Sequence, residues 1–152
     1  MPVTLVLIST ALLAIWWLRR RFVVVTVTGP SMLPTLRHGD SLLVRRTRVG
    51  GLRHGVVVVL ELPPQAAAPD APAAPDGADR WSVKRVVGLP GDVTAGIDGA
   101  NRPVPAGCLA VAGDNVAVSY DSRHVGPVRG DRLLGVVVRR LRTADGEVAP
   151  AP

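Results

Sequence analysis

The sequence predicts a mainly β domain of short antiparallel strands behind one apolar N-terminal helix. Residues 3–18 carry no charge, which sets them apart from the rest of the chain. The remainder contains runs of β-branched residues separated by Gly and Pro, of which the chain has 16 and 14; such runs are typical of strands and turns. No segment after Arg21 shows the 3.6-residue period of an amphipathic helix. With 152 residues, 47% of them apolar, the chain is long enough for one folded domain.

The N-terminal segment has the composition of a membrane anchor. Sixteen helical residues span roughly 24 Å, slightly less than the ~30 Å of a hydrocarbon core. Trp16 and Trp17 end the apolar run, and Arg19, Arg20 and Arg21 follow it, an order typical of a membrane interface. A cleaved signal peptide needs a basic start and a small-x-small site, and neither is present. We therefore expect residues 1–21 to be an uncleaved single-pass anchor with a basic flank; a buried core helix is the alternative.

Strands are expected in six later segments. They cover residues 22–28, 41–46, 56–60, 81–89, 108–112 and 133–141. Gly29 and Pro30 break the first strand, residues 31–36 form a turn or helical stub, and residues 38–40 form another turn. The five apolar residues 56–60 read as a fully buried strand.

Two segments carry little that a core can use. Residues 63–79 are rich in Pro, Ala and Asp and predict a flexible loop between two strands. Residues 143–152 resemble them and predict a disordered tail. The remaining residues of 22–142 are about a hundred, enough for one small β domain.

The charge balance restricts the possible partners. Eighteen Lys and Arg against twelve Asp and Glu give a net charge of +6, which favours a nucleic acid or an anionic membrane. Only five aromatic residues are present, too few for base stacking, so no nucleic-acid partner is expected. A single cysteine, Cys108, excludes a disulfide framework and a multi-cysteine zinc site. The three histidines have no metal-ligand spacing, and no metal or cofactor is expected.

Lys84 is the only lysine among the 18 cations. A coding bias towards arginine explains this on composition alone. The other explanation is a position that arginine cannot fill, because a buried amine can lose its proton whereas a guanidinium stays charged.

Three segments contain candidate functional residues. Residues 29–36 place Ser31 in a turn after a strand, where a serine is ordinarily a cap or a surface hydroxyl. Residues 83–92 place Lys84 inside an apolar strand, where it either points to solvent or is buried. Residues 113–123 form a polar loop, for which side-chain to main-chain turn bonds are the simpler explanation.

Together these segments resemble the type I signal peptidases, membrane-bound Ser/Lys peptidases. The first reads G-x-S-M-x-P-T-L-x-x-G-D, the second K-R-V-V-G-L-P-G-D, and the third G-D-N-x-x-x-S-x-D-S-R-x-x-G-P-V. They occur in the family's order behind an N-terminal apolar segment and cover most of residues 22–140. The resemblance implies a small signal-peptidase-like β domain of the Gram-positive type.

The resemblance also implies roles for individual residues. Ser31 would be the nucleophile, and Lys84 its general base, which must be neutral to act. Ser119 would orient the lysine amine, and Asp121 and Arg123 would brace their loop as an ion pair. Supporting roles would fall to the other motif residues Gly29, Met32, Pro34, Arg85, Gly113, Asp114, Asn115 and Ser122.

The oxyanion hole is only partly specified by the resemblance. The Ser31 N–H would be one donor. Some members carry a Ser or Thr two residues before the nucleophile, where this chain has Gly29. The second donor is therefore left to Thr28 or to a main-chain group.

The implied substrates are exported preproteins, bound in extended form with small residues at positions −1 and −3. The implied location is the plasma membrane, with the catalytic domain on the extracytoplasmic face, although Arg19–Arg21 favour the cytoplasmic side by the positive-inside rule. A first alternative is a dedicated peptidase of the same family that matures one precursor. A second is a non-enzymatic membrane-associated β domain that binds anionic partners. Self-cleaving Ser/Lys repressors are disfavoured, because no segment resembles a DNA-binding domain.

Overall fold

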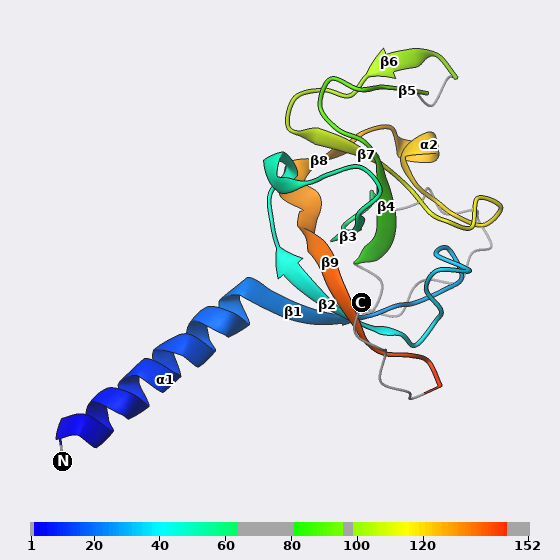
Figure 1. The fold of residues 1–152 in the computed structure, drawn as a ribbon. Coiled ribbons are helices and arrows are strands. Elements are labelled where there is room, and N and C mark those ends of the chain that lie inside the picture. Colours follow the sequence, from blue (N-terminus) through cyan, green and yellow to red (C-terminus); the bar gives the residue numbers. More distant parts are fainter. Residues whose placement is uncertain (1, 64–80, 96–98, 146–152) are drawn as a thin grey trace.

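The computed structural model describes residues 2–63, 81–95 and 99–145 (Figure 1). Helix α1 (Pro2–Arg21) projects from a β domain and runs directly into the first strand. The strands are β1 (Phe22–Thr26), β2 (Ser41–Arg46), β3 (Val57–Leu60), β4 (Ser82–Gly88), β5 (Val93–Ala95), β6 (Asn101–Pro103), β7 (Cys108–Ala112), β8 (Val128–Arg129) and β9 (Leu133–Arg142). The short helices are η1 (Val49–Gly51), α2 (Ser122–Val125) and η2 (Gly130–Arg132).

Seven strands form one antiparallel sheet in the order β1-β2-β9-β3-β4-β7-β8. Strands β5 and β6 form a separate antiparallel hairpin. The sequence-based prediction of a mainly β fold with short antiparallel strands and one N-terminal helix is confirmed. Strand β9 lies between β2 and β3, so the last strand joins the beginning of the domain to its middle.

The strand boundaries follow the predictions closely. Strands β2 and β7 have the expected limits; β4 is one residue shorter than expected at each end, and β9 is one residue longer at its C-terminal end. Strand β1 ends at Thr26 rather than residue 28, because Val27 pairs with the turn at Asp40 and Gly39 instead of β2. Val56 precedes β3, and both Val56 and Val57 are only partly buried, so the expectation of a fully buried strand over 56–60 is wrong for its first two residues.

Six of the elements were not expected. They are the strands β5, β6 and β8 and the short helices η1, α2 and η2. Each has two to four residues, too few for a periodic pattern to show. Helix α2 is nevertheless well capped: the Asp121 side chain accepts from the Arg123 N–H, and the Asp121 N–H donates to His124.

Two apolar clusters fill the interior. One contains Met32 and Leu36 together with residues of β2, β3, β4 and β9. The other contains Val58, Leu60, Val86, Leu109 and Val111 from the middle of the sheet. Met32 is fully buried, so the segment that follows Ser31 is anchored in the core by its own side chains.

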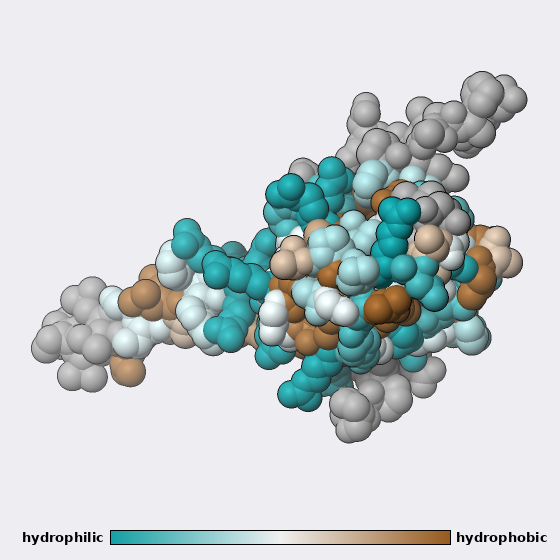
Figure 2. All heavy atoms as spheres, turned by 90° about the horizontal axis from the view of Figure 1, so that it is seen from above, coloured by the Kyte–Doolittle hydropathy of each residue, from teal (hydrophilic) through white to brown (hydrophobic). Residues whose placement is uncertain are grey.

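Helix α1 stands out from the β domain, and its side chains from residue 7 to residue 21 are exposed to solvent (Figure 2). The exposed apolar side chains are Leu7, Ile8, Leu12, Leu13, Ile15, Trp16, Trp17 and Leu18. The Arg20 and Arg21 guanidinium carbons lie 4.0 and 5.1 Å from the ring centroids of Trp16 and Trp17. Within the described residues, no helix has the length and apolarity that crossing a membrane requires. The anchor over residues 1–21 stays a prediction.

Two other predictions concern segments that are mostly not described. The loop over residues 63–79 lies outside the described residues except for Pro63. The tail over residues 143–152 lies outside them from residue 146 onward.

Candidate active site

Lys84 is buried in the sheet. It lies on β4 opposite Val58 of β3, and its side chain is 4% exposed. Val83 and Val86 on the same strand are also buried, so both faces of β4 are covered at this point. Removal from water disfavours the ammonium form and lowers the pKa of Lys84. A lysine with a depressed pKa has the property that a neutral amine base requires.

A chain of hydrogen bonds holds the Lys84 amine. Lys84 Nζ donates to Ser119 Oγ at 3.1 Å, and Ser119 Oγ donates to Asp121 Oδ2 at 2.7 Å. A hydroxyl has one proton, and here that proton points to the carboxylate. Ser119 therefore meets Lys84 with an oxygen lone pair, which fixes the amine as the donor in this contact. A neutral amine in this position retains its own lone pair for another partner.

Asp121 is fully buried and ionised. Burial by itself favours the neutral acid, but donors surround the carboxylate: the Arg123 guanidinium, the Gly113 N–H at 2.9 Å and the Ser119 hydroxyl. Together they hold the pKa of Asp121 far below its usual range. The Arg123 pair is bidentate, with Nε to Oδ1 at 2.9 Å and Nη2 to Oδ2 at 2.7 Å.

The two charges of this ion pair act on Lys84 in opposite directions. Burial is the largest cause of its lowered pKa, the negative charge of Asp121 raises that pKa, and the positive charge of Arg123 lowers it. Arg123 thus offsets the attraction by which Asp121 would keep the amine protonated.

Ser31 lies in the turn between β1 and β2, and its side chain is partly exposed. The turn is joined to the loop that carries Ser119. The Asn115 N–H donates to the Ser31 carbonyl at 3.0 Å, and Asn115 Nδ2 donates to the Pro30 carbonyl at 3.3 Å. Asn115 therefore holds the Ser31 turn and the Ser119 loop together through two hydrogen bonds. Farther along the turn, Pro34 is exposed and follows a cis peptide bond.

Gly113 allows the two segments to approach each other. A Cβ atom at this position would collide with Ser119 Oγ, Ser119 Cβ and the Ser31 carbonyl oxygen. The main chain of the Ser31 turn and the side chain of Ser119 therefore both lie against the place where a side chain at residue 113 would begin. Between Ser31 and Lys84, both of which the structure describes, no hydrogen bond is formed. Catalytic hydrogen bonds often tighten only when substrate binds.

A second ion pair braces the site from β4. Arg85 donates to Asp114 through Nε at 2.8 Å and Nη2 at 2.6 Å, and through Nη1 to the Gly55 carbonyl at 2.7 Å. The Arg85 bond is the largest cause that lowers the pKa of Asp114, and a hydrogen bond from the Thr35 side chain adds to it. Asp114 thus connects the strand of Lys84 to the loop that carries Asn115 and Ser119.

A groove runs along β1, the edge strand of the sheet. Its lining includes Val23, Val25 and Thr28 from this segment and Trp81 just before β4. Thr28 is exposed there, on the side of the turn that leads to Ser31. Its role as an oxyanion donor stays a prediction.

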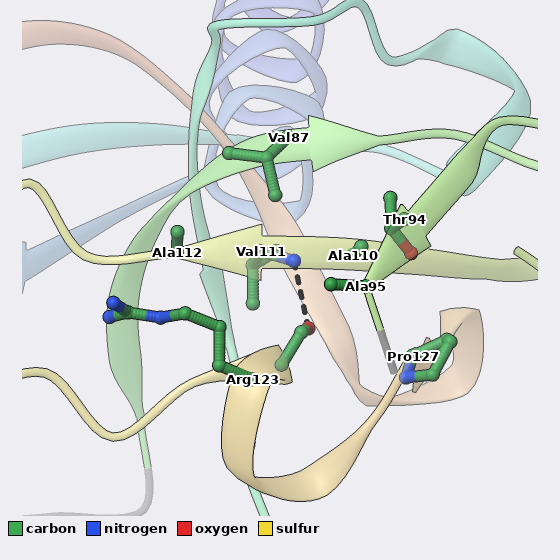
Figure 3. A pocket seen from close by; sticks show the side chains of 9 residues that line it. Val87, Thr94, Ala95, Ala110, Val111, Ala112, Arg123 and Pro127 are labelled. Carbon is green, nitrogen blue, oxygen red and sulfur yellow. Dashed lines mark hydrogen bonds between the residues drawn. The ribbon is translucent and has the colours of Figure 1, made fainter. Parts of the chain in front are cut away.

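A second, smaller pocket of about 140 Å³ lies between β4, β7, β5 and α2 (Figure 3). Val87, Ala95, Ala110 and Pro127 give it an apolar wall. Ser122 also lines it, but the Ser122 hydroxyl already accepts from the Val111 N–H at 2.8 Å. In the described part of the chain, no group of three His, Cys, Asp or Glu side chains is placed to hold a metal ion.

Two residues of the site were not identified from the sequence. Asp40 is buried and binds the Arg37 N–H, the Ala144 N–H and Arg140, so it ties the end of the Ser31 segment to the end of β9. His38 accepts the Gly29 N–H on Nδ1 at 3.2 Å. The Gly39-Asp40 pair in the first motif was a signal for Asp40; no pattern in the sequence pointed to His38.

Comparison with known proteins gives the family. The family profile "Signal peptidase, peptidase S26" matches residues 2–98 and 93–141. The mitochondrial inner membrane protease subunit 1 of Schizosaccharomyces pombe is 33% identical over 128 residues, which cover 79% of this chain and 73% of that protein. Signal peptidase I of Leptolyngbya laminosa is 31% identical over 152 residues, 83% and 72% of the two chains. Signal peptidase I of Bacillus caldolyticus is 28% identical over 150 residues, 73% and 74% of the two chains.

These matches define the class: the chain is a serine peptidase. It belongs to the signal peptidase family, peptidase S26. The resemblance to type I signal peptidases seen in the three motifs is confirmed.

Proposed function

We propose that this protein is a membrane-bound endopeptidase that removes signal peptides from preproteins, with Ser31 as nucleophile and neutral Lys84 as general base. The observation that carries the proposal is the buried Lys84 amine, held by Ser119 beside the segment of Ser31. An ordinary surface lysine is charged at neutral pH and is no base. Burial of the only lysine in the chain supports a chemical role rather than a coding accident.

The chemistry follows from these groups. The Ser31 hydroxyl attacks the scissile carbonyl carbon while Lys84 Nζ takes its proton. The Ser31 N–H stabilises the resulting oxyanion. The C–N bond then breaks, Lys84 gives the proton to the leaving amine, and an ester on Ser31 remains. Water attacks the ester with Lys84 again as base, which releases the acid and restores the Ser31 hydroxyl.

The groove along β1 suits an extended peptide. Edge strands present unpaired N–H and C=O groups to which a peptide can add as a further strand. The groove lies on the segment that leads to Ser31, so a peptide bound in it would run towards the nucleophile. We assign the small residues at −1 and −3 of the preprotein to this region.

Helix α1 supports a location at a membrane. Its apolar side chains are exposed over several turns, and Trp16 and Trp17 with Arg19–Arg21 end it in the order expected at an interface. Exposed apolar surface of this extent marks a surface that is covered in the working protein. We propose α1 as the anchor of a plasma-membrane protein, with the β domain on the extracytoplasmic face.

The test is cleavage of a fluorogenic peptide with an Ala-x-Ala site by the full chain in detergent. Wild type is compared with the variants Lys84→Arg, Ser31→Ala and Ser41→Ala. Arginine keeps much of the bulk of lysine, but its guanidinium stays protonated and does not act as a neutral base. We expect Lys84→Arg and Ser31→Ala to lose at least a thousandfold in kcat/KM while their thermal unfolding stays cooperative. Ser41→Ala is the matched control on β2 and should cleave like wild type.

Cleavage by Lys84→Arg at the rate of wild type would contradict the proposed base. If wild type leaves the peptide intact but cuts one natural precursor, the dedicated peptidase replaces the general one. If no precursor is cut and Ser31 is not labelled by an acylating inhibitor, the proposal is wrong.

A further inference from the structure

The turn that carries Ser31 is held at three consecutive residues. The Gly29 N–H donates to His38 Nδ1 at 3.2 Å. The carbonyls of Pro30 and Ser31 accept from Asn115 at 3.3 and 3.0 Å. Asn115 therefore fixes one side of the turn, and His38 fixes the other.

The bond to His38 continues the hydrogen bonding between the two arms of the loop beyond the last main-chain pair. At the base of the loop, the Val27 N–H donates to the Asp40 carbonyl at 2.8 Å, and the Gly39 N–H donates to the Val27 carbonyl at 2.9 Å. Gly29 has a φ of 80°, a left-handed conformation that turns the chain away from this pairing. The acceptor for its N–H is an imidazole nitrogen rather than a carbonyl.

His38 is exposed, and the loop does not depend on it for packing. Met32 and Leu36 bury the segment in the core, and Asp40 closes its end. Loss of the His38 bond thus leaves the fold intact and frees mainly the Gly29 end of the turn. That end matters chemically, because Ser31 and its N–H follow two residues later, and an oxyanion donor must be aimed accurately.

We propose that His38 is a positioning residue for Ser31: through the Gly29 N–H, its neutral imidazole sets the turn that presents the nucleophile and its N–H. This inference rests on the proposed function, in which Ser31 is the nucleophile. The acceptor must be a lone pair at the Nδ1 position, so the imidazole carries its proton on Nε2.

Substitution of His38 by asparagine or by glutamine distinguishes a positioning role from a merely structural one. Asparagine places its Oδ1 acceptor near the position of Nδ1, whereas glutamine places its oxygen farther out, near Nε2. In the full chain, His38→Gln and His38→Ala should lower kcat for the Ala-x-Ala peptide about fivefold and leave KM within twofold. His38→Asn should recover most of that loss. His54→Gln is the matched control, because His54 is exposed and pairs only with Asp92 among the described residues.

A second readout does not depend on activity. Hydrogen exchange of the Gly29 amide, measured by NMR in detergent, should be faster in His38→Gln and His38→Ala than in wild type and His38→Asn. Equal exchange in all four proteins would overturn the inference. So would full kcat in His38→Gln and His38→Ala, or a loss in His38→Asn as large as in His38→Gln. The proposed function fails in a different way, when wild type does not cleave or when Ser31→Ala still does.

Discussion

Two buried carboxylates in this molecule are bound in similar ways but serve different ends. Asp40 accepts from two main-chain N–H groups and from Arg140. Asp121 accepts from the N–H groups of Gly113 and Arg123 and from the Arg123 guanidinium. The pKa of each lies below its usual value, in each case because hydrogen bonds outweigh the cost of burial.

The difference lies in the next partner. The partners of Asp40 are main-chain N–H groups and an arginine, and none of them changes its protonation state near neutral pH. Asp40 therefore only connects the Ser31 segment to the end of β9. Asp121 also accepts from Ser119, whose oxygen in turn accepts from Lys84. The charge of Asp121 therefore acts on Lys84, which the proposed function makes the general base. The ion pair of Asp40 holds two segments together, whereas the ion pair of Asp121 also influences the pKa of the proposed base Lys84.

Gly113→Ala should have the largest effect, because it disrupts the contact between the loop of Ser119 and Asp121 and the turn of Ser31. The added methyl would collide with Ser119 and with the Ser31 main chain, which has little room to move. We expect about 3 kcal/mol of lost stability and loss of cleavage, measured by chemical denaturation and the peptide assay. Gly50→Ala is the control, since its Cβ would meet nothing within 4 Å. An active, stable Gly113→Ala protein would mean that the two segments are not in close contact.

Substitution of each carboxylate by its amide tests whether the two sites differ in function. Asp40→Asn and Asp121→Asn each place an NH₂ group against a donor, and each should lose about 2 kcal/mol of stability. Only Asp121→Asn should lower kcat of the folded protein more than tenfold, because Ser119 then loses the acceptor that orients it towards Lys84. Denaturation curves and kcat, corrected for the folded fraction, check this. Equal losses of kcat in both variants would remove the distinction drawn between the sites.

Arg123→Gln should give the smallest and most specific effect. The positive charge of Arg123 lowers the pKa of Lys84 and offsets the opposite action of Asp121. Without it, the pKa of Lys84 rises, and a larger fraction of the amine is protonated at a given pH. The acid limb of the kcat/KM profile should therefore move to higher pH, by about half a unit because Arg123 is partly exposed. Arg129→Gln, which breaks an exposed pair with Asp131, should leave the profile in place. A shift to lower pH would reverse the sign argued for Arg123.

Much of the site was predictable, and for definable reasons. Ser31, Lys84 and Ser119 stand in motifs of fixed spacing, and Lys84 is also unique by composition. His38 was missed because its partner is the main-chain N–H of Gly29. Every residue except proline has such a group, so the sequence does not show which one a histidine binds. Asn115 was recognised as a motif residue, but its two bonds to Pro30 and Ser31 depend on how two distant segments meet.

The sequence alone determined the strands and the chemistry available to them. The short apolar runs Leu42–Val44 and Cys108–Ala112 define β2 and β7 locally, because strand propensity and turn formation act over a few residues. The tertiary structure decided the order β1-β2-β9-β3-β4-β7-β8, the burial of Lys84 and the direction of the Ser119 hydrogen bond. These depend on pairing between residues far apart in the chain, and on which side chains that pairing removes from water.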